Sequence, residues 1–193
     1  MAKASTLRNM VSVLLVITAV SSASLGVMYQ LTKAPKAAAE AAKQNFAIKA
    51  VLSGYDNEPA AEAYKTASFD GGDSLVCYPA SKDGKPQGVA VRTWTTKGFS
   101  GLIRLMVGFD TEGNIINISV LEQRETPGLG SKMTGAEFKD QYSGKHPARN
   151  NLSVKKDGGE VDAITAATIT SRAFSDAVNR AYKSLKFENE TDH

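Results

Sequence analysis

The stretch SGLIRLMVGFDTEGNIINISVLEQ, residues 100–123, contains two apolar runs on either side of a polar turn. The runs at 100–110 and 115–123 are rich in leucine, isoleucine and valine, and DTEGN at 110–114 lies between them. Apolar runs joined by a short segment that contains glycine are typical of a β-hairpin. We therefore predict two antiparallel strands here.

Further elements are predicted on both sides of this hairpin. SLVCYPA at 74–80 and GVAVRTW at 88–94 have the character of strands, and 54–74 reads as a polar connection. After the hairpin, a Pro-Gly loop, a short helix at 135–142 and one more strand at 151–156 are expected. A final helix is predicted because apolar residues recur at spacings of three and four. These are Ile169, Ala173, Phe174, Ala177, Val178, Ala181, Tyr182 and Leu185. Strands followed by helices indicate an α+β fold.

The composition of the N-terminal part predicts a membrane-spanning segment. From Asn9 to Thr32 no side chain is charged, and as a helix these residues span about 36 Å, enough for a hydrocarbon core of about 30 Å. Lys3 and Arg8 precede the segment, so the N-terminus is expected in the cytoplasm and the rest of the chain outside it. A cleaved signal peptide is the alternative, because Ser21, Ser22 and Ala23 are small. Pro35 is expected to break the helix before an alanine-rich helix that ends near Gly54.

Charge and residue counts exclude several classes of protein. The first 36 residues carry four basic side chains and no acidic one, whereas the remainder has 19 basic and 20 acidic side chains. A near-neutral domain argues against nucleic acid as a partner. Cys77 is the only cysteine and is expected to be buried, so neither an intrachain disulfide nor a Cys/His metal site is predicted. His146 is expected to be a solvated loop residue, and His193 ends the chain.

Four hydroxyl side chains crowd the start of the final helix, in VDAITAATITSRAF at 161–174. Asp162 or Thr165 is a candidate N-cap, and capping needs only one such side chain. A helix N-terminus also presents free N–H groups and a partial positive charge, which suit a phosphate. The cluster therefore has two interpretations, an ordinary cap or an anion site.

Three sequence features together resemble a known family. DAITAATITS at 162–171, ETPGLG at 125–130 and the hairpin beginning GFSGLI at 98 are similar to the FMN-binding subunits of bacterial respiratory complexes. Among these subunits the chain resembles the RnfG family of the Rnf electron-transport complex, which is related to the NqrC family of the sodium-pumping NADH:quinone oxidoreductase. The similarity covers roughly residues 85–187 and implies an FMN-binding domain with an antiparallel or mixed sheet flanked by helices.

The resemblance also implies a set of cofactor-binding residues. The family attaches FMN through its phosphate to the threonine that corresponds to Thr168. The residues around this threonine that match the motif are Thr165, Ala167, Ile169, Thr170 and Ser171, and Ala166 lies among them in the same implied cofactor-binding segment. The family has glycine where this chain has Ala166, and alanine costs nothing there if the position is right-handed helical. In the upstream loop, the resemblance implies that Glu125 and Thr126 contact the flavin, Gly128 leaves it room and Leu129 packs on it.

These inferences lead to a functional expectation. The chain would be a membrane-anchored electron carrier in an Rnf-type ion-translocating complex that passes electrons between ferredoxin and NAD⁺. Its partners would be the other membrane and peripheral proteins of that complex. It would not be catalytic alone, and it would bind neither ferredoxin nor NAD directly, because it lacks a dinucleotide fingerprint and iron–sulfur cysteines. No histidine or cysteine lies near Thr168 in the sequence, so a separate flavin transferase would attach the FMN. Trp94 and Phe99 are expected in the core.

Two alternatives remain at this point. One is an NqrC protein of the quinone-reducing complex, and the other is an anchored module that holds an anion reversibly without redox chemistry.

The chain is expected to divide into five parts. They are a cytoplasmic N-terminus at 1–8, a transmembrane anchor at 9–32, a helical connection with the first strand at 33–84, an FMN-binding domain at 85–187 and a disordered tail at 188–193. The predicted location is the bacterial cytoplasmic (inner) membrane, with the domain on the periplasmic side.

Overall fold

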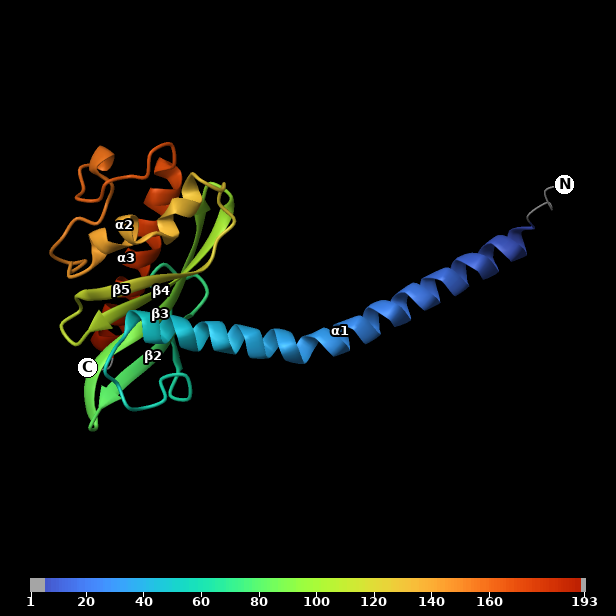
Figure 1. Ribbon diagram of the computed structural model, residues 1–193, viewed down its shortest axis with the longest axis horizontal. Helices are drawn as coiled ribbons and strands as arrows, with labels where there is room; N and C mark the ends of the chain where they lie inside the picture. Colours follow the sequence, from blue (N-terminus) through green and yellow to red (C-terminus); the bar gives the residue numbers. More distant parts are fainter. Residues whose placement is uncertain (1–5, 192–193) are drawn as a thin grey trace. The chain divides into compact units, whose positions relative to one another are not determined.

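The computed structural model describes residues 6–191, and side chains over residues 6–185. The chain divides into two compact units, with the boundary after Lys43. The expected tail at 188–193 falls on residues whose side chains lie outside the described range. Helix α1, Leu7–Val51, crosses the boundary without interruption (Figure 1).

The expected break at Pro35 is wrong, because Pro35 lies inside α1. Proline lacks the N–H that would bond to the carbonyl four residues earlier, which costs an isolated helix about 3 kcal/mol. The alanines that follow have the highest helix propensity, so helical structure continues on both sides of this point. The helix ends close to the predicted place, and Gly54 has a φ of 77°, a left-handed conformation that suits glycine.

The first part of α1 is long and apolar enough to cross a membrane. Its most apolar window of 18 residues has a mean hydropathy of 2.1 and is wholly exposed in the structure. A cleaved signal sequence would meet the same criteria of length and composition.

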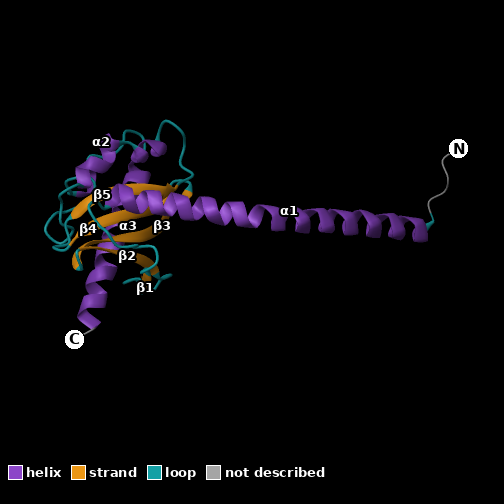
Figure 2. Cartoon of the chain, turned by 60° about the horizontal axis from the view of Figure 1, so that its bottom comes forward, coloured by secondary structure: helices purple, strands orange, loops and turns teal. Residues whose placement is uncertain are grey.

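The second unit is built on one antiparallel sheet of five strands in the order β1-β2-β3-β4-β5 (Figure 2). The strands are β1 Tyr64–Thr66, β2 Leu75–Lys82, β3 Lys85–Gly98, β4 Gly101–Asp110 and β5 Ile115–Glu122. Four of the five strands predicted from the sequence, those at 74–80, 88–94, 100–110 and 115–123, are confirmed as β2 to β5. Strand β1 lies within the predicted polar connection, and its three residues YKT carry no alternating apolar pattern.

The two faces of the sheet are covered by different helices. Helix α3, Thr168–Thr191, packs on one face through Phe174, Ala177, Val178 and Ala181, which meet strand residues such as Val107. The end of α1 and the next residue, Leu52, cover the other face, where Ala47, Ile48, Val51 and Leu52 meet Tyr78, Ala80, Ala90 and Met106. Successive residues of a strand point to opposite faces, so both β3 and β4 contribute to each core.

The connection from β5 to α3 contains short elements. Helix α2, Ala136–Lys139, agrees with the short helix predicted at 135–142. The strand predicted at 151–156 is wrong, because the chain makes only an isolated bridge between Val154 and Val161. Residues Lys155–Asp157 turn as a short 3₁₀ segment instead, and this turn ends at Gly158, whose φ is 81°.

Candidate functional site

Helix α3 begins at Thr168, later than the sequence indicated. The carbonyl of Ala167 accepts the first helical bond, from the Ser171 N–H at 3.0 Å. The expected caps are wrong, because Asp162 pairs with Lys155 at 2.7 Å and Thr165 lies three residues before the helix. The residue at the cap position is therefore an alanine, which offers no side-chain oxygen to the helix.

The first turn of α3 consequently has free donors. Among the described residues, the backbone N–H groups of Thr168, Ile169 and Thr170 have no hydrogen-bond acceptor. Unpaired N–H groups and the positive end of the helix dipole favour an anion at this position. This geometry supports the anion-site interpretation of the hydroxyl cluster over the ordinary cap.

The hydroxyls of the cluster differ in accessibility. Ser171 is fully buried, and its Oγ bonds to the carbonyl of Ala167 and accepts the N–H of Ile164. Thr170 is 1% exposed and donates to Glu125. Thr168 is half-buried, lines a cavity, and makes no side-chain hydrogen bond to any described residue. Thr165 is exposed and does not line that cavity.

Ala166 has a left-handed backbone conformation, with a φ of 60°. The condition under which alanine would cost nothing, a right-handed conformation, is not met. An L-residue in this region is strained by about 1–2 kcal/mol. The family's glycine at this position therefore has a physical reason, which is the positive φ of the turn that leads into α3.

The loop at 125–130 is tied to α3 and to the β3–β4 turn by one carboxylate. Glu125 is 5% exposed; its Oε1 accepts the N–H of Ser100 at 2.9 Å and its Oε2 accepts the hydroxyl of Thr170 at 2.5 Å. A Cβ on Gly98 would lie 2.8 Å from Oε1, and one on Gly130 would lie 2.7 Å from Oε2. Both positions therefore need glycine to leave room for this carboxylate.

A cavity of about 420 Å³ opens between these elements. Its size is within the range of small-molecule sites. It is lined by Phe99, Glu125, Thr126, Leu129, Gly130, Ala166, Ala167, Thr168, Ile169 and Thr170. Of the residues implied by the family resemblance, Gly128, Thr165 and Ser171 are not among those that line it.

Three exposed apolar side chains surround this cavity. Phe99 is 68% exposed, and Leu129 and Ile169 are also exposed. The expectation that Phe99 belongs to the core is wrong, because it occupies the tip of the β3–β4 turn. Trp94, in contrast, packs against the core beneath the guanidinium of Arg180, 4.6 Å from the ring centroid. Exposed apolar groups around a concave site are typical of surfaces that receive a planar ligand.

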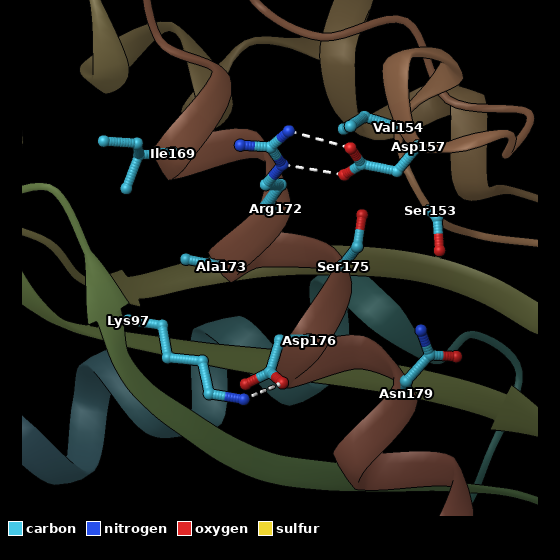
Figure 3. Close-up of a pocket in the computed structure, with 10 residues that line it drawn as sticks. All are labelled: Lys97, Ser153, Val154, Asp157, Ile169, Arg172, Ala173, Ser175, Asp176 and Asn179. Atoms are coloured by element: carbon cyan, nitrogen blue, oxygen red, sulfur yellow. Dashed lines mark hydrogen bonds and ion pairs between the residues drawn. The ribbon is translucent and has the colours of Figure 1, made fainter.

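A second cavity, of about 500 Å³, shares Ile169 with the first. Figure 3 shows the residues that line this second cavity. Two ion pairs flank it, Lys97 with Asp176 at 2.6 Å and Arg172 with Asp157 at 2.7 Å. The hydrogen bond from Arg172 lowers the pKa of the Asp157 carboxyl. No pattern in the sequence indicated this cavity, because its residues come from β3, from the turn at 153–157 and from α3.

His146 takes no part in either cavity. It is 8% exposed, so the expectation of a solvated side chain is wrong. Its Nδ1 accepts the N–H of Ala148, and its Nε2 lies 3.1 Å from the carbonyl oxygen of Glu112, to which it donates. Cys77 is buried in the core, as expected.

Comparison with known proteins identifies the family. The RnfG protein of the ion-translocating oxidoreductase complex from Photorhabdus laumondii is 34% identical over 184 residues, which cover 91% of this chain and 88% of that protein. The chain belongs to the RnfG family. The Yersinia pestis member is 39% identical over 134 residues, which cover 66% of this chain and 64% of that protein.

The family assignment agrees with a domain match and confirms the sequence resemblance. Residues 98–183 match the family model of the FMN-binding domain, and this range includes both the loop at 125–130 and the start of α3. Two crystal structures are also similar. NqrC of Shewanella oneidensis has a TM-score of 0.47 at 21% identity, covering 61% of this chain and 62% of that one. The corresponding protein of the Na⁺-translocating NADH-quinone reductase of Parabacteroides distasonis has a TM-score of 0.45 at 25% identity, covering 58% and 59%.

Proposed function

We propose that this RnfG family member is a membrane-anchored electron carrier of an Rnf-type ion-translocating oxidoreductase. In this proposal FMN is attached by a phosphoester to Thr168, and the complex passes electrons between ferredoxin and NAD⁺. Bound FMN supplies reversible uptake of one or two electrons. The observation that carries the proposal is the coincidence of an FMN-binding domain match with a free hydroxyl and free N–H groups at the start of α3.

The phosphate end of FMN fits the first turn of α3. A phosphoester on the Thr168 hydroxyl would lie beside the unpaired N–H groups of residues 168–170. These donors and the helix dipole stabilise negative charge without a cationic side chain. Thr168 is favoured over its neighbours because Thr170 and Ser171 are buried and hydrogen-bonded.

In this proposal the flavin ring occupies the cavity of about 420 Å³ that Thr168 helps to line. Phe99, Leu129 and Ile169 supply exposed apolar area that a planar ring would cover. In this arrangement the protein holds the ring in place and excludes water from part of it, while one edge stays accessible to redox partners.

Attachment of FMN requires help from outside the chain. No side chain among the described residues bonds to the hydroxyl of Thr168, so no base is in place to activate it. His146, the one described histidine, bonds to Glu112 and Ala148 instead. We therefore propose a separate flavin transferase that recognises the segment around Thr168.

The test is covalent flavin fluorescence on a denaturing gel. In cells that contain a flavin transferase, the wild type should fluoresce and Thr168→Ala should not. Thr111→Ala, which removes an exposed hydroxyl in the β4–β5 turn, outside the segment around Thr168, is the matched control and should fluoresce like the wild type. Protein from cells without the transferase should carry no covalent flavin.

Several outcomes would count against this proposal. A fluorescent Thr168→Ala band would move the attachment site to another hydroxyl. Self-attachment of free FMN by the purified chain would remove the need for a transferase. A wild type without covalent flavin would favour the anchored module that holds an anion reversibly. Co-purification with other proteins of a quinone reductase would favour the NqrC alternative.

A further inference from the structure

Glu125 is a buried carboxylate without a cationic partner. It is 5% exposed and lines the cavity beside the start of α3. Seven ion pairs are found among the described side chains, and none of them includes Glu125. A buried charge is expensive unless other groups compensate it, so this position requires an explanation.

The surroundings of Glu125 fix its carboxylate at the cavity wall. Both oxygens accept hydrogen bonds, Oε1 from the N–H of Ser100 and Oε2 from the hydroxyl of Thr170. Gly98 and Gly130 leave the space that the two oxygens occupy, since a Cβ on either would come within 2.8 Å of them. Three chain segments therefore converge on one carboxylate, and hydrogen bonds from neutral donors replace the water that burial removes.

We propose that the charge of Glu125 lowers the reduction potential of the bound flavin. This inference rests on the proposed function, because it places the flavin ring in the cavity that Glu125 lines. Two-electron reduction with uptake of one proton leaves the ring with one additional negative charge. A fixed carboxylate nearby opposes that charge, and its effect is strong because the partly buried site has a low effective dielectric constant.

A structural role of Glu125 can be separated from a role of its charge. Hydrogen bonds alone hold the loop at 125–130, the β3–β4 turn and α3 together, and this structural tie needs no charge. Glutamine has the size of glutamate and keeps both bonds, because its amide oxygen accepts from Ser100 and its amide nitrogen donates to the Thr170 oxygen. The reduction potential therefore separates the two roles, since Glu125→Gln removes the charge and keeps the tie.

The experiment is a redox titration of the flavinylated full-length protein in detergent at pH 8, followed by flavin absorbance. Glu125→Gln should shift the potential to more positive values than the wild type, and the shift should persist at high salt because the charge is buried. Thr170→Val loosens the tie and keeps the charge, so its potential should not rise. Glu137→Gln removes an exposed carboxylate on α2 and should leave the potential unchanged.

An unchanged potential in Glu125→Gln would overturn the inference, and so would an equal rise in Thr170→Val, which would assign the effect to the tie. Loss of covalent flavin in Glu125→Gln would also contradict it, because the proposal gives the charge no part in attachment. Failure of the proposed function has a different signature, since the wild type itself would then lack covalent flavin.

Discussion

At the scale of single residues, the site depends on a strained turn. Ala166 and Asp83 are the two residues other than glycine with a positive φ among residues 6–191. Ala166 is the third residue of the turn in which the N–H of Ala167 bonds to the carbonyl of Ile164 at 2.9 Å, and α3 begins directly after this turn. Strain of this kind is common at functional sites, where the surrounding structure holds it in place.

We expect Ala166→Gly to stabilise the fold. Glycine relieves the left-handed strain, although it also increases the entropy of the unfolded chain, so a net gain of about 1 kcal/mol is expected. This gain corresponds to a rise in Tm of about 2–4 °C for a domain of this size. Thermal unfolding in detergent measures it. Ala163→Gly, at a position without positive φ, is the control and should lower the Tm. A lower Tm in Ala166→Gly would contradict this account.

At the scale of elements, the turn between β4 and β5 is held by hydrogen bonds to the side chain of Asp110. The Oδ1 of Asp110 accepts the N–H groups of Glu112 and Asn114, at 2.9 and 2.8 Å, and its Oδ2 accepts the side-chain amide of Asn114. Burial raises the pKa of Asp110, but the hydrogen bonds from Asn114, Glu112 and Gly113 outweigh it, so the net pKa is lowered. The ionised carboxylate therefore stabilises the turn.

We expect Asp110→Asn to make stability less dependent on pH. The folded-state pKa lies below the unfolded value of about 3.9. The stabilisation by Asp110 is therefore fully present above that value and is lost as pH falls through the folded-state pKa. The variant should be less stable by about 1 kcal/mol at pH 7, a figure reduced for partial exposure. Urea unfolding between pH 7 and pH 2 should show the difference shrinking at low pH, and a constant difference would contradict the prediction.

At the scale of the whole molecule, one helix belongs to both compact units. Residues up to Lys43 form the first unit, which contains the uncharged segment, whereas Ala47 to Leu52 pack on the sheet of the second. A helical span of 24 residues is long enough for the hydrocarbon core of a membrane. Together with membership of the RnfG family, this fits a membrane-anchored protein.

We propose that the second unit lies on the periplasmic side, and cysteine labelling tests this. Cys77 is buried, so an introduced surface cysteine should dominate the reaction with a membrane-impermeant maleimide. In intact spheroplasts, Lys156→Cys should be labelled, and Thr6→Cys, before the span, should be labelled only after permeabilisation. The reverse pattern would place the domain in the cytoplasm. Cleavage after Ala23 would appear as a shorter chain by mass spectrometry.

Much of the fold follows from local patterns in the sequence. The four longer strands and α3 carry their apolar periodicity within a single segment, and the uncharged N-terminal run needs only its length and composition. Two features were not predictable in this way: strand β1, and the isolated bridge at Val154 in place of the strand predicted at 151–156. Pairing with other segments decides whether such short stretches become strands. Continuity of α1 through Pro35 depends on the balance between one lost hydrogen bond and the flanking helix propensity.

The candidate site divides in the same manner. The sequence by itself determined the motif around Thr168, the loop at 125–130 and the glycine-to-alanine change at Ala166. Only the tertiary structure decided that Ala166 is left-handed, that Phe99 faces the cavity, and that Glu125 bonds to Thr170, which lies 45 residues away in the chain. The physical reason is that hydrophobic periodicity and caps act between near neighbours, whereas a cavity exists only where separate segments pack together.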